Sequence, residues 1–282
     1  MNLADIKTIE QVLRPLGFSF KKSLGQNFLI NPDVCPAMAN AACDKDTAVI
    51  EIGPGIGVLT KELAKAAGKV VTIELDERLK PVLSKTLAEQ DNVTVIFGDA
   101  MKLNLKEIID NEFKGYEKIC VCANLPYYIT SPVIMMLLEN RLPLNSITVM
   151  VQKEAAERLA AEVGTREAGA VTVAVNYYAT AELLFEVNRN SFMPPPNVDS
   201  AVIKLNVRKS PPVRVNSEAD FFKFVKAAFA QRRKTLVNTV SNSLHIDKEK
   251  IKSVLNELKI EETIRSEQLT LDQLCNIANK LF

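Results

Sequence analysis

The chain alternates short apolar runs with segments of helical periodicity. The apolar runs lie at 47–52, 69–75, 93–97, 118–123 and 146–151. Between them, apolar residues recur at helical spacing near 57–67, 77–89, 103–110 and 132–140. Strands that alternate with helices are joined by crossovers and pair mostly in parallel. The sequence therefore predicts an α/β fold built on a doubly wound, Rossmann-like sheet.

Several predicted helices carry signals at their ends. The first, at residues 3–16, stops at Gly17. Asn31-Pro32 and Ser131-Pro132 each have the pattern of an N-cap residue followed by Pro at the first helical position. Pro81 lies inside the helix predicted at 77–89, so we expect that helix to begin late or to bend.

The pattern changes after the fifth strand. Helices are predicted at 151–162 and 168–178, and strands at 180–188 and 200–207 add an antiparallel edge to the sheet. After the linker-like Ser210-Pro-Pro212, only helical patterns follow, at 218–230, 234–243, 247–257 and 270–281. We predict two domains, the sheet domain at 1–209 and a small all-helical domain at 210–282.

Composition excludes several classes of protein. No apolar run approaches the roughly 20 residues of a membrane helix, and the N-terminus lacks a signal-peptide pattern, so we expect a cytosolic protein. The five cysteines form no CxxC pair, and there is one histidine, so we expect no metal site. We expect Cys120 and Cys122 to serve as small apolar residues of a buried strand. Nothing indicates an obligate dimer, and we expect a monomer.

A glycine-rich turn, Gly53-Pro-Gly-Ile-Gly57, follows the first strand of the alternating series and opens a helix. Glycines allow the backbone to approach a ligand closely, and a helix N-terminus offers free N–H groups. A dinucleotide fingerprint requires Gly or Ala at position 58, which is Val58 here. The turn therefore favours a nucleoside-containing ligand other than a dinucleotide.

Polar residues end the next strands. Glu74 is placed to accept hydrogen bonds from ribose hydroxyls, and Asp99 from an adenine amine. In Asn124-Leu-Pro-Tyr127, the amide oxygen of Asn124 and a backbone carbonyl can accept from an exocyclic amine, and Tyr127 can stack on a base. Each of these residues is individually also compatible with an ordinary turn. Together they predict a ligand site, because the carboxyl ends of parallel strands share one sheet edge.

Positive charge is concentrated late in a nearly neutral chain, whose net charge is +1. The stretch from Lys204 to Lys234 holds nine basic residues against Glu218 and Asp220. This pattern is typical of contacts with a nucleic-acid backbone, and it is also compatible with a solvated helix face.

The sequence resembles the ribosomal small-subunit RNA adenine dimethyltransferases from about residue 20 to 240. The resemblance rests on Gln26-Asn-Phe-Leu29, Glu51–Gly57, Glu74-Leu-Asp76, Gly98-Asp-Ala100, Asn124–Tyr127, Gln152-Lys-Glu154, Ser191-Phe-x-Pro-Pro-Pro-x-x-Val-Asp-Ser200 and Arg232-Arg-Lys-x-Leu236. It implies a class I methyltransferase fold and S-adenosyl-L-methionine as methyl donor, with S-adenosyl-L-homocysteine as product. The implied substrate is a pair of adjacent adenines in a hairpin near the 3′ end of small-subunit (16S) ribosomal RNA, modified during ribosome biogenesis.

The resemblance also assigns roles to residues of this sequence. The implied cofactor contacts are Asn27, the backbone of Leu29, Gly53, Gly55, Glu74, Asp99, Ala100 and Asn124. Asn124 and Leu125 are expected to hold the target amine, with the base between Tyr127 and Phe192; the alternative for Phe192 is a loop anchor packed in its own domain. The expected RNA contacts are Arg232, Arg233, Lys234, Lys21 and Lys22.

Two other functions remain open at this stage. A related methylase acts on large-subunit RNA and confers antibiotic resistance, but Pro194–Pro196, Val198–Ser200 and Arg232–Lys234 favour the small subunit. A non-catalytic RNA-binding assembly factor would keep the fold, but intact residues at 74, 99 and 124 argue against it.

Overall fold

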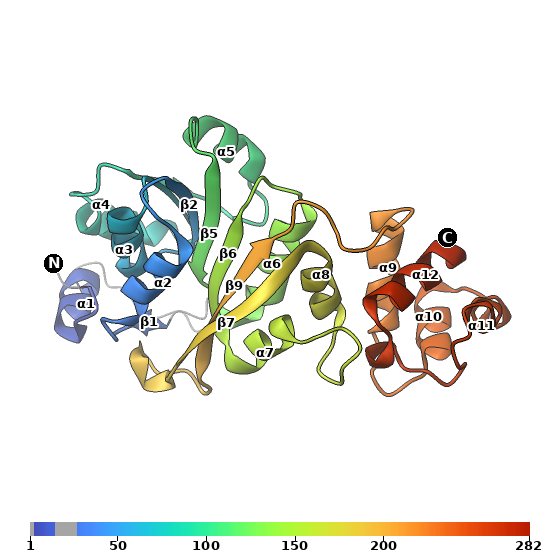
Figure 1. Cartoon of the computed structure of the whole chain (residues 1–282). Helices are drawn as coiled ribbons and strands as arrows, with labels where there is room; N and C mark the ends of the chain where they lie inside the picture. The colour runs from blue at the N-terminus through green and yellow to red at the C-terminus, as the bar shows by residue number, and fades with distance from the viewer. Residues whose placement is uncertain (1–2, 15–26) are drawn as a thin grey trace. The chain divides into compact units, whose positions relative to one another are not determined.

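The structure, a computed structural model, describes residues 3–14 and 27–282 (Figure 1). It divides into two compact units. The first, here called the sheet unit, is Met1–Ala156 with Glu182–Val207, and the second, the helical unit, is Glu157–Ala181 with Arg208–Phe282. The chain therefore passes from one unit to the other after residues 156, 181 and 207, and the predicted boundary near residue 209 corresponds only to the last of these. Residues 157–181, which were assigned to the sheet domain, group with the C-terminal helices instead.

The sheet has seven strands in the order β4-β3-β2-β5-β6-β9-β7. Neighbours from β4 to β6 pair in parallel, and β9 runs antiparallel to β6, as predicted. The predicted apolar runs coincide with strands to within one residue at each end. The strands are β2 (Thr47–Ile52), β3 (Lys69–Glu74), β4 (Val93–Phe97), β5 (Lys118–Asn124), β6 (Ser146–Gln152), β7 (Ala179–Val187) and β9 (Ser200–Val207).

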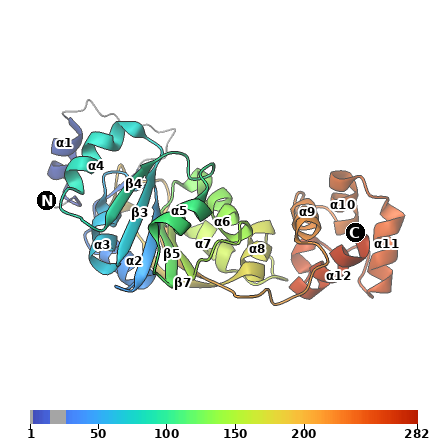
Figure 2. The same ribbon diagram turned by 90° about the horizontal axis from the view of Figure 1, so that it is seen from above.

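The strand order reverses at β2, because β3 and β4 lie on one side of it and β5 and β6 on the other. Right-handed crossovers that progress in opposite directions place their helices on opposite faces of a sheet. Helix α2 (Val34–Ala42) packs over β5 and β6, and α3 (Val58–Ala66) packs over β3 and against α2. Helices α5 (Leu105–Glu112) and α6 (Thr130–Glu139) lie on the other face (Figure 2).

The helix starts differ from the sequence signals at two places. Helix α2 begins at Val34, because the Asn31 side chain accepts the N–H of Asp33 and forms a turn before the helix. Helix α6 begins at Thr130, so Ser131 is inside the helix and not its cap. The prediction for Pro81 is confirmed, since a short 3₁₀ turn precedes helix α4 (Lys80–Thr86), whose second residue is Pro81.

Two elements near the N-terminus complete the sheet unit. Helix α1 (Ile6–Leu13) is capped by Asp5, whose side chain accepts the N–H of Thr8. Ile9 of this helix is buried in an apolar cluster that includes Ile56 of the glycine-rich turn. The predicted end at Gly17 lies outside the described residues. Strand β1 (Phe28–Leu29) pairs with β8 (Phe192–Met193), a small antiparallel sheet that the sequence did not indicate.

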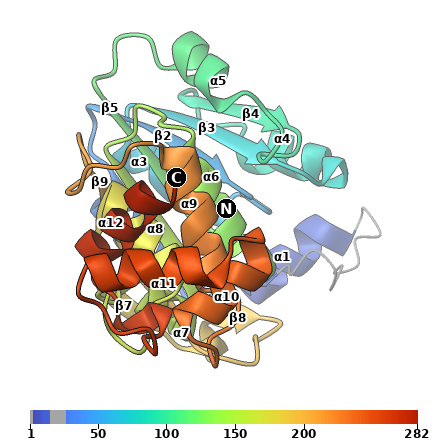
Figure 3. The same ribbon diagram turned by 90° about the vertical axis from the view of Figure 1, so that its right-hand side faces the viewer.

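The helical unit is held together by an aromatic cluster. The hydroxyls of Tyr177 and Tyr178, at the end of α8 (Ala170–Tyr178), both donate to the Glu218 carboxylate, at 3.1 and 3.2 Å. The Tyr178 ring also stacks on Phe222 at 5.1 Å between centroids. These contacts join α8 to α9 (Glu218–Ala228), which precedes α10 (Leu236–Leu244), α11 (Lys248–Glu257) and α12 (Leu271–Leu281) (Figure 3).

Candidate functional site

A cleft of ≈1250 Å³, its open mouth included, lies at the carboxyl ends of strands β2 to β5 in the sheet unit. This is the edge where parallel sheets bind ligands, next to the point at which the strand order reverses. All of the expected cofactor and target residues line this one cleft: Asn27, Leu29, Gly53, Gly55, Glu74, Asp99, Ala100, Asn124, Leu125, Tyr127 and Phe192.

The glycine-rich turn forms the floor of the cleft after β2. Gly53, Gly55 and Gly57 have φ angles of +73°, +58° and +91°, a region that other residues rarely adopt. A Cβ atom added to Gly53 would meet nothing within 4 Å, so this residue leaves open space on the ligand side. Gly57 is the N-cap of α3, whose first N–H groups provide hydrogen-bond donors at this end of the helix. The turn therefore fits a ligand whose atoms approach the backbone closely.

Glu74, the last residue of β3, is fixed by backbone donors. Its Oε2 accepts the N–H of Gly55 at 3.2 Å and its Oε1 accepts the N–H of Asp76 at 2.8 Å. The side chain is buried, which raises its pKa, although these two bonds favour the charged form. Each carboxylate oxygen has a second lone pair, so the residue can still accept from ribose hydroxyls.

Asp99 and Ala100 follow β4 on the far side of the cleft. One carboxylate oxygen of Asp99 accepts the N–H of Met101 at 3.0 Å, and the other lies 3.5 Å from the ammonium of Lys102. The first bond fixes the carboxylate at the rim, where it retains capacity to accept from an amine. Ala100 is buried beside it and leaves room for a flat ring.

Asn124 ends β5 with a half-buried side chain, paired in register with Met150 of β6. Among the described residues, no hydrogen bond engages its side-chain amide. The next residue, Leu125, is 1% exposed, and its N–H donates to the Met150 carbonyl at 3.3 Å. The backbone at this strand end is therefore held by the sheet, while the Asn124 amide is available to a ligand.

Tyr127 is positioned by a residue 73 positions later in the sequence. Its hydroxyl lies 2.7 Å from the hydroxyl of Ser200, the buried first residue of β9. Burial of the ring raises the pKa of the Tyr127 phenol, so it stays protonated at neutral pH. This contact gives a structural reason for the Val198-Asp-Ser200 motif, which holds the aromatic ring of the Asn124–Tyr127 loop in place.

Phe192 lines the cleft from the small β1–β8 sheet, where it pairs in register with Leu29. Only 3% of Phe192 is exposed, and it belongs to a buried apolar cluster with Leu29, Cys35 and Met38. This burial favours the loop-anchor alternative over a freely exposed stacking surface. Pairing of the two strands does bring the Asn27–Leu29 segment to the cleft, as the resemblance implied.

Sequence reasoning gave no role to Glu51, a cleft-lining carboxyl near the carboxyl end of β2. It is 1% exposed, and burial raises its pKa to about 7, although the Thr60 hydroxyl donates to its Oε2 at 2.6 Å. The available signals were an acid within the apolar run 47–52 and its position at the start of the Glu51–Gly57 motif. A buried carboxyl that titrates near neutral pH in a ligand cleft is a functional-site candidate.

The basic residues Arg232, Arg233 and Lys234, here called the basic cluster, lie in the helical unit before α10 and are exposed. Arg232 donates to the carbonyl of Arg166 at 2.6 Å, which ties the cluster to the loop before α8. Neither Arg233 nor Lys234 pairs with a carboxylate of the described residues. Lys21 and Lys22 lie outside the described residues.

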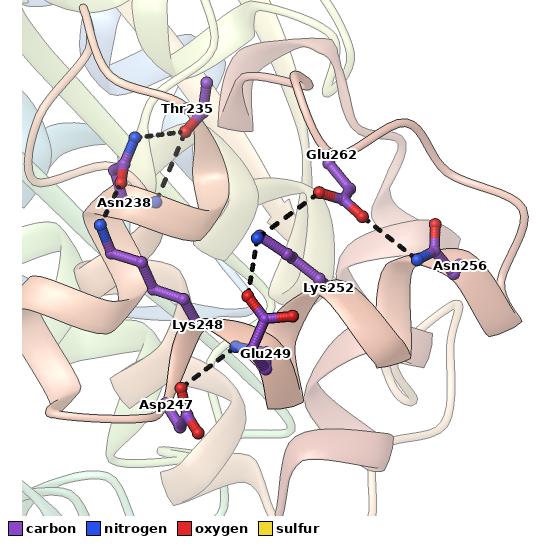
Figure 4. Close-up of polar contacts among 8 residues, drawn as sticks. All are labelled: Thr235, Asn238, Asp247, Lys248, Glu249, Lys252, Asn256 and Glu262. Atoms are coloured by element: carbon purple, nitrogen blue, oxygen red, sulfur yellow. Dashed lines mark hydrogen bonds and ion pairs between the residues drawn. The ribbon is translucent and has the colours of Figure 1, made fainter.

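A polar network holds the helix that follows the basic cluster (Figure 4). Thr235 caps α10, and its hydroxyl accepts from the Asn238 amide at 3.0 Å, while Asn238 accepts from Lys248 of α11 at 2.8 Å. Farther along α11, Lys252 pairs with Glu249 at 2.7 Å and lies 3.9 Å from Glu262. The lysines of α11 are thus engaged within the protein, whereas the basic cluster presents its charge to solvent.

Within the part of the chain that the structure describes, no helix is long and apolar enough to cross a membrane. Residues 3–14 and 27–282 also contain no group of three Cys, His, Asp or Glu side chains arranged to hold a metal ion. All five cysteines are free, and burial raises the pKa of the half-buried Cys43 thiol to about 12. Cys120 and Cys122 are buried, in keeping with the prediction of small buried residues at these positions.

Known proteins match the chain over nearly all of its length. Proteins described as ribosomal RNA small subunit methyltransferase A from Geobacillus thermodenitrificans and Oceanobacillus iheyensis are 49% and 46% identical over 276 and 277 residues. These matches cover 96% and 97% of this chain, and 94% of each relative. A dimethyladenosine transferase from Plasmodium falciparum superimposes with a TM-score of 0.72 at 29% identity, covering 89% of this chain and 95% of that one.

The fold is also shared with the 23S rRNA methyltransferase ErmE, at a TM-score of 0.65 and 24% identity, covering 90% of this chain and 99% of that one. These likenesses confirm the predicted class I methyltransferase sheet. The model of the family described as ribosomal RNA adenine dimethylase matches residues 17–281. From this match and the relatives above, the chain belongs to the ribosomal RNA adenine dimethylase family.

Proposed function

We propose that this protein dimethylates the N6 amines of two adjacent adenines in small-subunit ribosomal RNA, with S-adenosylmethionine as methyl donor. Family membership supports the reaction class, and the most similar relatives described above carry small-subunit names. The observation that carries the proposal is the Asn124 amide, which has no protein partner among the described residues and lies in a cleft that the glycine-rich turn also lines. We also propose that the enzyme acts as a monomer in the cytoplasm, where small subunits assemble.

The cleft residues fit such a cofactor. Gly53 leaves the space for close approach, and we expect Glu74 to accept hydrogen bonds from the ribose and Asp99 from the adenine amine. When bound, S-adenosylmethionine supplies an electrophilic methyl group on a positively charged sulfur. The protein's part is to hold the acceptor amine in line with it, and positioning of this kind can contribute roughly 7 kcal/mol or more.

Asn124 and Leu125 act on the acceptor amine. An aromatic amine is a poor nucleophile because its lone pair is delocalised into the ring. If the Asn124 side-chain oxygen and the Leu125 carbonyl accept its two hydrogens, the nitrogen is drawn toward tetrahedral geometry and its lone pair is freed. Methyl transfer leaves the nitrogen positively charged, and this acidic cation can lose its proton to water, so no strong general base is required. A base stacked in RNA must be splayed out to reach this site, where Tyr127 can stack on it at roughly 1–3 kcal/mol.

The choice of ribosomal subunit is tested with a labelled methyl donor and purified, unmodified small and large subunits. We expect two methyl groups on each of two adjacent adenines of the small subunit and none on the large subunit. Labelling of the large subunit alone would support the antibiotic-resistance methylase instead. Binding to small subunits without any labelling would support the assembly-factor alternative.

Replacement of all three residues of the basic cluster by alanine should weaken binding to small subunits. Each lost phosphate contact lowers the magnitude of the slope of log affinity against log salt by roughly 0.7–0.9, so this magnitude should fall by roughly 2–3 if all three contact RNA. The measurement is subunit affinity between 50 and 200 mM salt. The matched control removes three lysines that already pair with carboxylates, Lys106, Lys252 and Lys280. Equal slopes in the parent and the cluster variant would contradict the prediction.

A further inference from the structure

Exposed apolar side chains gather at the cleft of the sheet unit. Seven large apolar residues of the described chain are exposed, and three of them line this cleft: Leu75, Met101 and Tyr128. Tyr128 is 58% exposed, the largest fraction among the seven. Isolated exposed apolar residues are normal, but a group at the rim of one cleft indicates a surface that a ligand covers.

The three residues belong to two halves of the cleft. Leu75 follows β3 and Met101 lies after β4, on the side that carries Glu74 and Asp99. Tyr128 follows β5, which lies on the opposite side of β2 in the sheet order. Leu75 and Met101 therefore adjoin the proposed cofactor, whereas Tyr128 adjoins the proposed target base beside Asn124.

Tyr127 and Tyr128 are consecutive residues of a 3₁₀ turn, Tyr127–Ile129. With three residues per turn, consecutive side chains point roughly 120° apart, so these two rings cannot sandwich one base. Tyr127 is turned inward by its hydroxyl contact with Ser200, at 2.7 Å. Tyr128 has neither a hydrogen bond nor a ring contact with any described residue, and its ring is open to an outside partner.

We propose that Tyr128 is a stacking platform for the nucleotide next to the target adenine. The inference rests on the proposed function and adds a second RNA contact to the same site. When one base is splayed into the cleft, its neighbour in the chain loses a stacking partner and exposes a ring face. An aromatic side chain at the mouth can cover that face without reading the base, because every base has a π surface.

The test compares Tyr128→Ala and Tyr128→Phe with the parent on unmodified small subunits. Loss of one base stack corresponds to roughly 5- to 160-fold in affinity. We expect Tyr128→Ala to raise KM for the subunit by that factor, with kcat within about threefold of the parent and unchanged S-adenosylmethionine affinity by calorimetry. Tyr128→Phe should restore the parent KM. Leu183→Ala, which removes an exposed apolar residue of β7 away from the cleft, is the control.

Three outcomes would overturn the proposal. A KM of Tyr128→Ala within twofold of the parent would mean that the ring does not contact the substrate. A Tyr128→Phe variant as impaired as Tyr128→Ala would mean that the hydroxyl acts, and lost cofactor affinity in Tyr128→Ala would mean that the residue has a structural role. The proposed function fails separately, if the parent enzyme itself leaves small subunits unmethylated.

Discussion

Asn124→Ala should retain S-adenosylmethionine binding and lose methyl transfer, with kcat reduced roughly 100- to 1,000-fold. Loss of one preorganised hydrogen-bonding group at a reacting centre has effects of this size. The Asn124 amide has no partner among the described residues, so its removal leaves no buried protein group unsatisfied, and we expect the fold to be unaffected. Single-turnover transfer to small subunits measures the chemical step, and calorimetry measures cofactor affinity.

Two further variants make this prediction specific. Asn124→Gln keeps the amide but moves it by one methylene, and should also be strongly impaired because the position of the oxygen matters. Asn140→Ala, at the exposed C-terminus of α6, removes an amide outside the cleft and should behave as the parent. A normal rate of methyl transfer in Asn124→Ala would show that the Asn124 amide has no part in the mechanism.

Glu51→Gln should change how stability depends on pH. The folded protein holds the Glu51 proton more tightly than the unfolded chain, since its pKa is about 7 against a usual 4.5. The stability that this provides is fully present below pH 4.5 and is lost as pH rises through about 7. Between pH 5 and pH 8, the free energy of unfolding should shift in favour of the variant by roughly 2–3 kcal/mol, measured by urea denaturation without cofactor.

The exposed residue Glu117 offers a control, since Glu117→Gln makes the same change of charge at the protein surface. A second readout is cofactor affinity. S-adenosylmethionine is positively charged, so its binding should favour ionised Glu51, and its affinity for the parent should rise as pH passes 7. If the affinity of the parent for S-adenosylmethionine does not change with pH across this range, Glu51 does not interact with the cofactor.

The strands were predictable because buried parallel strands are continuous apolar runs, and β2 and β4 have the predicted bounds. Their carboxyl ends share one edge by topology, so Glu74, Asp99 and Asn124 could be placed together before any coordinates. Helix starts were less predictable, because a residue with a capping side chain does not always cap a helix. Asn31 forms a turn before α2, and Ser131 lies inside α6.

Contacts between distant residues were not predictable from local pattern. Tyr127 and Ser200 meet only because β9 returns beside β6, and nothing in either motif indicates the other. Glu51 reads as one residue of a strand, and its raised pKa follows from burial that only the packed helices create. The Phe192 ring was expected to face a base, but the β1–β8 pairing that buries it had no recognisable signal.

The membership of α8 in the helical unit bears on how such enzymes can be recombined. An exchange made after residue 209 would replace α9 but keep α8, so Tyr177 and Tyr178 of one parent would face an unrelated partner in place of Glu218 and Phe222. The two segments that form the helical unit are therefore not contiguous in the sequence. A chimaera that swaps RNA recognition between relatives must carry residues 157–181 together with the C-terminal segment.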